Sequence, residues 1–586
     1  MRQWMVAAKK ADFYAIAEKF HVDPVVARII RNREVIGEKN IRIYLGGNLS
    51  DLSDPHQMKD MDQLVEILAQ KIRKQVHIRI IGDYDVDGVT SSHLFLTALR
   101  RVGAKVDVVI PHRIQDGYGL SLHLLQQAKE DGVDTILTCD NGIAAIDEIA
   151  WAKAQKMTVL VTDHHAVPFE EHEGRRTEKK SLADAVVNPH QQDCGYPYKE
   201  LCGAGVAWNV IRVLYENYDM DKREAEDLLD FVAMATVCDV MSLTGENRIL
   251  VKEGLKRIRH TKNIGLQALM QACNVQPENI SAYHFGYVLG PCVNATGRLD
   301  TARHALRLFE TGQETEAEEI ARDLVDLNQE RKELTLQGVE MAKKLCEEGG
   351  YENDPVLVLF LPDVHESIAG LIAGRIREMY NRPVFVLTRG EEGVKGSGRS
   401  TENYSMYENM CGCAELFTKF GGHPMAAGLS LPEENVEKFR RKINENCPLT
   451  VEEVCPDIHI DMAMPVGYAS TELVHQFALL EPFGKDNPSP LFADRNLSIS
   501  RMWLIGKNRN VLRMSVLSEY GQPVPVIFFG DVETLFAYFT EKFGQEEVEN
   551  ALHGRKNRIL FSMVYTAKID FYQGNENLQL EMKYYR

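Results

Sequence analysis

Short apolar runs alternate with amphipathic stretches between residues 76 and 162 of the chain. The apolar runs cover residues 76–81, 106–110, 135–138 and 158–162. The amphipathic stretches between them cover residues 89–102, 120–129 and 143–155. Strands separated by single helices of this length are typical of βαβ units. The alternation therefore predicts a parallel, Rossmann-like sheet with right-handed crossovers.

Three of the apolar runs end in side chains that can bind a metal ion. The first run leads into Gly82-Asp-Tyr-Asp-Val-Asp-Gly88, the third into Asp140, and the fourth into Asp163-His-His165. Another acid, Asp239, follows a buried helical pattern at residues 228–238. Because ligand sites in parallel sheets form at the carboxyl ends of the strands, we expect these groups to converge on one edge of the sheet.

Each of these groups also has an explanation that involves no such site. The Asp-x-Asp-x-Asp-Gly spacing fits the start of an EF-hand calcium loop, but the twelfth position of that loop is Leu94 instead of Glu, and a strand pattern precedes it. A solvated acidic turn explains the first motif alone, and a helix N-cap explains Asp140 alone. Convergence of four such groups on one sheet edge favours a metal site.

Carboxylates outnumber imidazoles in this set, which suits Mn²⁺ or Mg²⁺ better than zinc. The set also offers more ligands than one ion needs. Two ions about 3.5–4 Å apart that share a carboxylate can activate water and stabilise the charge that develops in phosphoryl transfer. We therefore expect a site for two ions and the hydrolysis of phosphoesters.

Three further parts are indicated after this region. Residues 311–349 carry apolar side chains at helical spacing, interrupted by Arg331 and Gly338, and predict one long helix between two lobes. The next lobe alternates strands with a helix and contains two glycine-rich segments, 394–400 and 421–428, whose backbone amides can approach an anion if they form turns. Short alternating runs after about residue 455 predict a small barrel.

Composition is typical of a cytoplasmic globular protein with several domains. The 586 residues are 44% apolar, which provides a core for each of about three to five domains. No stretch has the ~18 apolar residues of a membrane span, and the first residues lack the pattern of a signal peptide. Eleven cysteines without CxxC pairs indicate reduced thiols. The net charge of −18 argues against broad, non-specific adhesion to nucleic acid but permits a local basic cleft.

Four motifs of the chain resemble those of the DHH phosphoesterase superfamily. They are Asp83-Tyr-Asp-Val-Asp-Gly88, Asp140-Asn-Gly142, Asp163-His-His165 and Val237-Cys-Asp239. The stretch 54–61 and the segment 291–298 narrow the resemblance to the RecJ family of single-strand-specific DNA exonucleases. The resemblance implies a metal-dependent enzyme that degrades single-stranded DNA in the 5′→3′ direction to 5′-mononucleotides, in DNA repair and recombination. It also implies a monomer that has a helicase and a single-strand-binding protein as partners and contacts no membrane.

The resemblance implies an α/β fold class and an order of domains. We expect an N-terminal helical region at residues 1–70, a DHH catalytic domain containing the parallel sheet at 71–310, and a connecting helix at 311–349. A smaller α/β DHH-associated domain is expected at 350–450, and a β-barrel of the OB-fold type at 451–586.

By the family pattern, one set of residues binds the metal ions and another binds DNA. The metal-ligand candidates are Asp85, Asp87, Asp140, His164, His165 and Asp239, to which Asp83 is added as a catalytic residue. Asp83 and Asp163 either bind metal directly or orient a neighbouring ligand, and Asp140 is the candidate that bridges the two ions. The candidates for DNA phosphates are Arg113, Ser397 and Arg399 at the 5′-terminal phosphate, with Arg298 and His423 near the scissile bond. The candidates in the barrel are Trp503, Lys507, Arg509 and Arg513.

Two departures from the family pattern and two other functions stay open at this point. Val364-His-Glu-Ser367 stands where Trp-His-Glu-Gly is usual, and Asp486 stands where glycine is usual, at a turn that needs left-handed backbone. One alternative function is a DHH phosphodiesterase of short oligonucleotides or cyclic dinucleotides. The other is a non-catalytic single-stranded-DNA-binding replication scaffold, which the complete set of acids and histidines opposes.

Overall fold

The chain folds into two compact units. The structure is a computed structural model that describes residues 3–113, 116–117, 119–172, 175–390, 393–506, 509–572 and 574–586. Residues Asn48–Pro456 form the first unit, and Gln3–Gly47 together with Asp457–Arg586 form the second. The region 1–70, expected as one helical part, is therefore divided between the two units.

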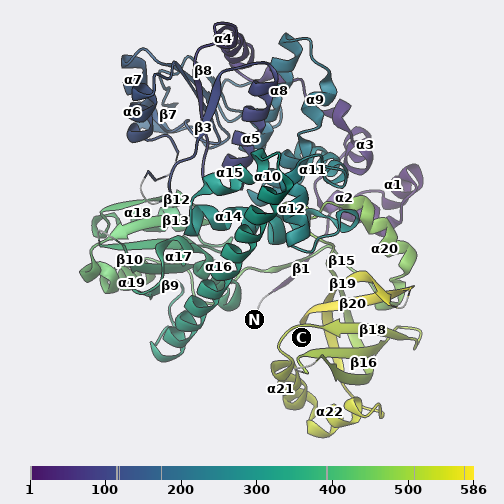
Figure 1. The fold of residues 1–586 in the computed structure, drawn as a ribbon. Coiled ribbons are helices and arrows are strands. Elements are labelled where there is room, and N and C mark those ends of the chain that lie inside the picture. Colours follow the sequence, from purple (N-terminus) through teal and green to yellow (C-terminus); the bar gives the residue numbers. More distant parts are fainter. Residues whose placement is uncertain are drawn as a thin grey trace. The chain divides into compact units, whose positions relative to one another are not determined.

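The first unit contains a five-stranded sheet with the strand order β3-β2-β4-β5-β8 (Figure 1). Its strands are β2 (Ile78–Ile81), β3 (Val106–Val109), β4 (Thr135–Cys139), β5 (Thr158–Thr162) and β8 (Ala185–Val187). Every neighbouring pair is parallel, which confirms the predicted Rossmann-like sheet. From β2 the chain adds β3 on one side and then returns to add β4 on the other, so a topological switch point lies between β2 and β4.

Helices cover both faces of this sheet. Successive strand residues point to opposite faces, so each strand contributes side chains to both layers of helices. Ile80 and Leu137 pack with α4, α5 and α8, whereas Ile81 and Ile136 pack with α6 and α7. Strands buried on both faces explain the continuous apolar runs. The covering helices are α4 (Met61–Arg73), α5 (Val86–Arg101), α6 (Leu122–Glu130), α7 (Ile146–Ala154) and α8 (Gly203–Asn217).

A group of helices continues the core of the first unit beyond α8. They are α9 (Lys222–Glu226), α10 (Leu229–Cys238), α11 (Gly245–Ile258), α12 (Ile264–Ala272), α13 (Ala282–His284), the π-helical turn η4 (Phe285–Leu289), α14 (Gly290–Leu299) and α15 (Ala302–Glu310). The long helix α16 (Glu314–Glu348) follows and confirms the predicted connecting helix. Its first half contributes Ile320 and Leu324 to the core of the parallel-sheet domain, and its second half contributes Val339 and Ala342 to the next core.

A second, smaller α/β domain packs on the end of α16. Its sheet has the order β12-β13-β11-β10-β9, in which only β9 and β10 are parallel among the described strands. Its elements are β9 (Leu357–Phe360), α17 (Glu366–Tyr380), β10 (Val384–Arg389), β11 (Val394–Arg399), α18 (Met406–Cys411), β12 (Lys419–His423), β13 (Ala426–Leu431) and α19 (Val436–Glu445).

The two glycine-rich segments of this domain lie mostly in strands, and three of their glycines, Gly396, Gly421 and Gly428, line a cavity. Segment 394–400 forms β11, which pairs with β10 on one side and β13 on the other. Segment 421–428 spans the hairpin of β12 and β13. Ladder pairing engages the backbone amides of the central strand β11, whereas β12 lies at the edge of the sheet.

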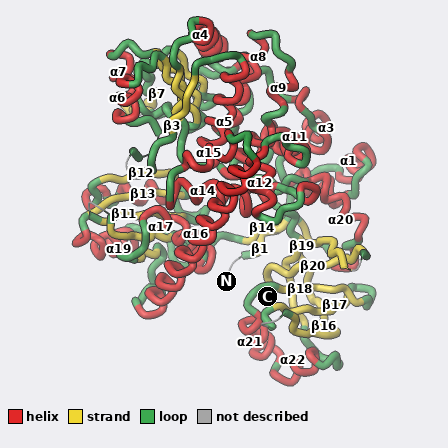
Figure 2. The backbone as a smooth tube through the Cα atoms, viewed as in Figure 1, coloured by secondary structure: helices red, strands yellow, loops and turns green. Residues whose placement is uncertain are grey.

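The second unit is built around a barrel. Its sheet has the order β15-β16-β17-β18-β20-β19, and a further pairing of β16 with β19 closes it. Strands that close on themselves leave no free sheet edge. The strands are β15 (Met462–Ala463), β16 (Phe492–Ile505), β17 (Val511–Leu517), β18 (Pro523–Phe528), β19 (Leu560–Tyr572) and β20 (Asn575–Tyr585), with helices α20 (Thr471–Phe477), α21 (Val532–Phe543) and α22 (Gln545–Leu552) (Figure 2).

Residues from the start of the chain complete the second unit. β1 (Trp4–Val6) pairs with β14 (Ile458–Ile460). The helices α1 (Phe13–Phe20), α2 (Pro24–Asn32) and α3 (Glu38–Gly46) share one hydrophobic core with the barrel. An ion pair of 2.7 Å between Arg33 and Asp461 joins the two segments. In the barrel unit Asp486 has φ 59°, the left-handed backbone expected at that position. Within the described ranges, none of the helices combines the length and the apolar character of a membrane span.

Candidate metal centre and phosphate cavity

The expected metal ligands follow the strands on either side of the switch point. Asp83, Asp85 and Asp87 come directly after β2, and Asp140 comes directly after β4. The pair His164 and His165 follows β5 in the same way. Asp239 reaches the site from the end of α10, where it is the C-cap. The crevice at a switch point is the place where α/β sheets bind ligands.

Seven side chains form three overlapping groups of possible ligands. Within each group, the ligand atoms lie within 4.8 Å of one another. The groups are Asp140, His164 and His165; Asp87, His164 and Asp239; and Asp83, Asp85 and Asp140. Because Asp140 and His164 each belong to two groups, the structure brings all seven expected side chains into one cluster.

Two helix N-termini hold the acids of the first motif. Asp85 caps α5, where its Oδ1 accepts a hydrogen bond of 3.1 Å from the Gly88 amide. Asp87 accepts hydrogen bonds from two amides in the first turn of α8, at 2.6 Å from Gly203 and 2.7 Å from Ala204. Amides and the helix dipole at an N-terminus stabilise a carboxylate. A Cβ atom on Gly203 would lie 2.6 Å from the Cβ of Asp140, so only glycine fits there.

Asp163 accepts hydrogen bonds on both of its oxygens and contacts the ring of a neighbouring histidine. Oδ2 accepts from the Ile143 amide at 2.9 Å. Oδ1 accepts from the amides of His164 and His165, at 2.7 and 3.1 Å, and lies 2.7 Å from Nδ1 of His165. Burial raises the pKa of Asp163, but the hydrogen bond and the charge of His165 bring it below the usual value. Asp163 thus fixes the orientation of His165.

His164 lies among three carboxylates. Its Nε2 is 3.0 Å from Oδ1 of Asp140, 3.6 Å from Oδ2 of Asp239 and 3.7 Å from Oδ2 of Asp87. Burial outweighs these charges and lowers the pKa of His164. At His165, burial lowers the pKa, but the hydrogen bond and charge of Asp163 raise it to about 9 overall. The surroundings therefore disfavour the charged form of His164 and favour that of His165.

The charge of the cluster fits one or more cations. Burial, together with the charges of neighbouring acids, raises the pKa of Asp83, Asp85 and Asp140. Oδ1 of Asp83 is buried and has no hydrogen-bond partner among the described residues. Like charges this close are stable only with a counter-ion or bound protons. Oxygen donors with one or two imidazoles are the set that suits Mn²⁺ or Mg²⁺.

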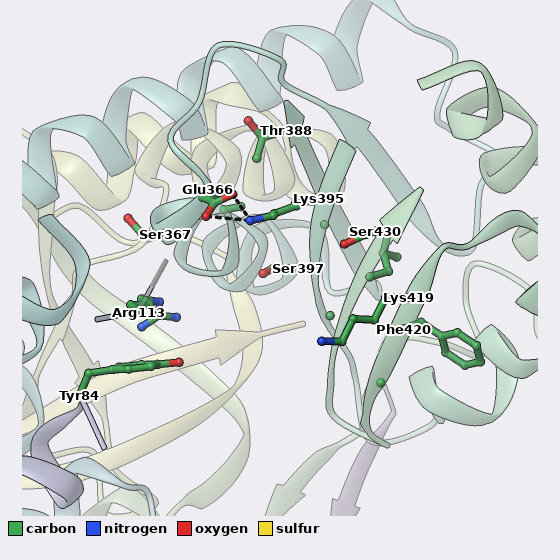
Figure 3. A pocket seen from close by; sticks show the side chains of 15 residues that line it. Tyr84, Arg113, Glu366, Ser367, Thr388, Lys395, Ser397, Lys419, Phe420 and Ser430 are labelled. Carbon is green, nitrogen blue, oxygen red and sulfur yellow. Dashed lines mark hydrogen bonds and ion pairs between the residues drawn. The ribbon is translucent and has the colours of Figure 1, made fainter. Parts of the chain in front are cut away.

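A cationic cavity of about 410 Å³ lies beside the cluster, between the two domains of the first unit (Figure 3). Arg113 stacks over the ring of Tyr84 at 4.8 Å, next to Asp83 and Asp85 in the sequence. From the second domain come Ser397 and Lys395, and Lys395 forms an ion pair of 2.8 Å with Glu366. Lys419 extends toward the cavity from β12 in Figure 3.

The remaining DNA candidates of the first unit, Arg298, Arg399 and His423, are not among the residues that line this cavity. Arg298 donates a hydrogen bond of 2.6 Å to the carbonyl of Ser367, which lines the cavity. Burial and the charges of Arg113, Arg331 and Arg399 lower the pKa of Arg298 to about 9. Burial and the charge of Arg113 likewise lower the pKa of Arg399. His423 is exposed at the end of β12 and does not line the cavity.

In the barrel, Trp503 lies between two arginines. The guanidinium groups of Arg501 and Arg513 are 5.8 and 5.9 Å from the Trp503 ring. Arg509 is exposed and has φ 52°. Lys507 lies outside the described residues.

Several residues of the site were not expected from the sequence. The amides of Gly203 and Ala204 hold Asp87, and Asn294 accepts a hydrogen bond of 3.2 Å from the amide of Val86. Lys395 lies two residues before the expected Ser397 in β11. Because side chains alternate along a strand, both lie on the same face, and this pattern could have indicated Lys395. No local signal distinguishes Lys419 from other surface lysines.

Comparison with known proteins gives three consecutive family matches. The DHH family, N-terminal domain, matches residues 77–236; the DHHA1 domain matches 353–447; and the RecJ OB domain matches 460–584. The last match agrees with the closed barrel of the second unit.

Individual relatives cover nearly the whole chain. The single-stranded-DNA-specific exonuclease RecJ of Haemophilus influenzae is 32% identical over 582 residues, which are 96% of each chain. RecJ of Bacillus subtilis is 33% identical over 512 residues, 87% of this chain but 63% of that longer protein. The crystal structure of RecJ in complex with Mn²⁺ from Thermus thermophilus has a TM-score of 0.79 at 25% identity and covers 100% of this chain and 79% of that one.

These matches run in the order of the domains described above, and the motifs that carry the resemblance are the residues of the acidic cluster. The chain therefore belongs to the RecJ family of single-stranded-DNA-specific exonucleases.

Proposed function

We propose that this chain is an exonuclease that hydrolyses the phosphodiester bonds of single-stranded DNA from the 5′ end and releases 5′-mononucleotides. The observation that carries the proposal is the cluster of five carboxylates and two imidazoles at the sheet edge, beside a cationic cavity. The names of the RecJ relatives support the substrate. The enzyme would act in DNA repair and recombination, in the cytoplasm.

Two ions of Mn²⁺ or Mg²⁺ would be held by Asp85, Asp87, Asp140, His164, His165 and Asp239, with Asp83 as a further ligand. Asp140 is the bridging residue in this proposal, because it belongs to two ligand groups. When bound, the ions supply Lewis-acid stabilisation for the charge that develops on the phosphate. Asp163 keeps His165 oriented, and the first turn of α8 keeps Asp87 in place.

The cavity would bind the 5′-terminal phosphate. Its lining carries three cations, Arg113, Lys395 and Lys419, against one carboxylate, Glu366. A terminal phosphomonoester carries a charge of about −1.5 to −2 at neutral pH, whereas an internal phosphodiester carries a single charge. The excess of cations therefore favours the end of a strand over its interior. Ser397 and Arg399 would complete this pocket, and Arg298 and His423 would contact phosphates near the scissile bond.

Contacts farther along the strand would come from the barrel, where Trp503 with Arg509 and Arg513 can stack bases and pair phosphates. A single-strand-specific enzyme needs partners that open duplex and present the strand. A helicase and a single-strand-binding protein fill these roles in the proposal, and the enzyme itself acts as a monomer.

The test compares four reactions of the purified protein with Mn²⁺. The substrates are a 5′-phosphorylated single strand, the same strand with a 5′-hydroxyl, a blunt duplex, and the first strand with EDTA. We expect mononucleotides from the phosphorylated strand, slower release from the 5′-hydroxyl strand, and none from the duplex or with EDTA. Equal rates on duplex and single strand, or activity that survives EDTA, would contradict the proposal.

A further inference from the structure

Two exposed tyrosines stack on each other at the surface of the first unit. Tyr283 lies in α13 and Tyr287 in the π-helical turn η4, with 62% and 71% of their surfaces exposed. Their rings are 5.0 Å apart and 22° from parallel. Large exposed aromatic side chains that gather in one place mark interaction surfaces, and π-helical turns are frequent at functional sites.

The turn that carries Tyr287 packs against the end of α10, where Asp239 lies. Phe285 and Leu289, which alternate with the tyrosines, are fully buried and fix the turn. The carbonyl of Phe285 accepts a hydrogen bond of 3.3 Å from Sγ of Cys238, the residue before Asp239. Val240, the residue after Asp239, is 62% exposed and has φ 54°. The two tyrosines therefore belong to a segment that packs on the helix whose last turn leads to Asp239.

Helix α14 connects this side of the cluster with the phosphate cavity. It begins directly after η4, and its Asn294 accepts the hydrogen bond from Val86, between two of the acids. At its other end, Gly297 packs so closely on the carbonyl of Tyr84 that a Cβ atom would collide with it. Arg298 then reaches Ser367 in the cavity wall. The ten residues of α14 span about 15 Å at ~1.5 Å per residue.

We propose that Tyr283 and Tyr287 form a stacking platform for the bases of single-stranded DNA on the 3′ side of the scissile bond. This inference rests on the proposed function. In this proposal, a strand whose 5′ phosphate occupies the cavity and whose scissile phosphate faces the cluster would continue along α14 toward the turn that carries the tyrosines. A base stacked on an aromatic ring contributes about 1–3 kcal/mol whatever its identity, which suits an enzyme that degrades strands of any sequence.

The platform predicts a dependence on strand length. A dinucleotide fills the cavity and the cluster but does not reach the tyrosines, whereas a long strand does. In Tyr283→Ala and Tyr287→Ala, the KM for long 5′-phosphorylated oligo-dT divided by the KM for the dinucleotide should rise about 5- to 150-fold, the equivalent of one stacked base. Phenylalanine at the same positions should keep the wild-type ratio, because it retains the ring. Tyr14→Ala, which removes a tyrosine with 78% exposure from the second unit, is the matched control.

A second measurement separates this inference from the proposed function. Binding of fluorescent oligo-dT is measured by anisotropy in EDTA, where no cleavage is required. Weaker binding by the alanine variants and normal binding by the phenylalanine variants would support the platform even if the wild-type protein released no nucleotide. Unchanged KM ratios and unchanged binding in all variants would overturn it and assign the exposed pair to a protein partner. Both tyrosines are exposed, and coincident unfolding transitions of wild type and variants check that the fold is retained.

Discussion

Asp83 and Asp163 are buried to a similar extent but differ in their hydrogen bonds. Asp83 has a buried oxygen without a hydrogen-bond partner in the described part of the chain, and it lies within reach of Asp85 and Asp140. Asp163 has filled both oxygens with donors from Ile143 and the two histidines. The contact of Asp163 with Nδ1 of His165 is of the kind by which an acid orients a metal ligand.

Asp163→Asn should therefore weaken metal binding without removing a ligand. The amide NH₂ would face an N–H donor, and His165 would lose the partner that fixes its ring. We expect about a 10–100-fold weaker affinity for Mn²⁺, measured by isothermal titration. The control is Asp131→Asn. It removes a carboxylate that lies outside the cluster and forms an ion pair of 2.8 Å with Arg79, so this variant should bind Mn²⁺ normally. Equal affinities of wild type and Asp163→Asn would show that this contact does not position the site.

Among the elements, α10 carries a buried acid that costs stability at its start and an acid of the cluster at its end. It ends at Asp239 in the cluster and begins near Asp230, whose carboxylate accepts hydrogen bonds of 2.6 Å from Thr261 and 2.9 Å from the Phe231 amide. Burial nevertheless raises the pKa of Asp230 to about 6. The folded protein therefore binds this proton more tightly than the unfolded chain does, and the ionised form is a cost to folding.

The pH dependence of stability follows from this shift. Because the pKa of Asp230 is raised from 3.8 to about 6, the protein loses stability as pH rises through this window, and the full cost is present above it. At pH 8, Asp230→Asn should recover free energy of unfolding on the order of 3 kcal/mol, since one pKa unit is equivalent to about 1.4 kcal/mol. The advantage should vanish near pH 4. Urea unfolding of both proteins at the two pH values measures it, and an advantage independent of pH would contradict the assignment.

The sequence predicted the elements better than it predicted their contacts. Strands β2, β4 and β5 and helix α17 lie where the apolar pattern indicates them, because burial on one or both faces dictates that pattern. The convergence of the candidate metal ligands was predicted from their positions directly after the strands. The hydrogen bonds of Gly203 and Ala204 to Asp87 join residues more than a hundred positions apart, and local pattern carries no information about them. The packing of residues 3–47 on the barrel depends in the same way on tertiary contacts.

At the scale of the whole molecule, local charge and total charge have opposite signs. The chain carries a net charge of −18, yet the cavity beside the cluster carries more cations than acids. A negative total charge opposes broad adhesion to nucleic acid, and a local surplus of cations can still bind a phosphate. This arrangement suits an enzyme that engages strand ends and does not coat DNA. In the proposed function, the acidic cluster carries the hydrolysis and other side chains supply the affinity for DNA.

The most direct test of this division of roles is Asp140→Ala. Asp140 joins two of the three ligand groups, so its loss should disrupt the cluster while the cavity and the barrel stay intact. The measurement is the release of labelled mononucleotide from a 5′-phosphorylated single strand with Mn²⁺, together with the binding of the same strand. Release should fall by at least about 10³-fold, close to the background rate, while binding of DNA stays nearly unchanged. Full release by Asp140→Ala would show that the acidic cluster does not carry the chemistry.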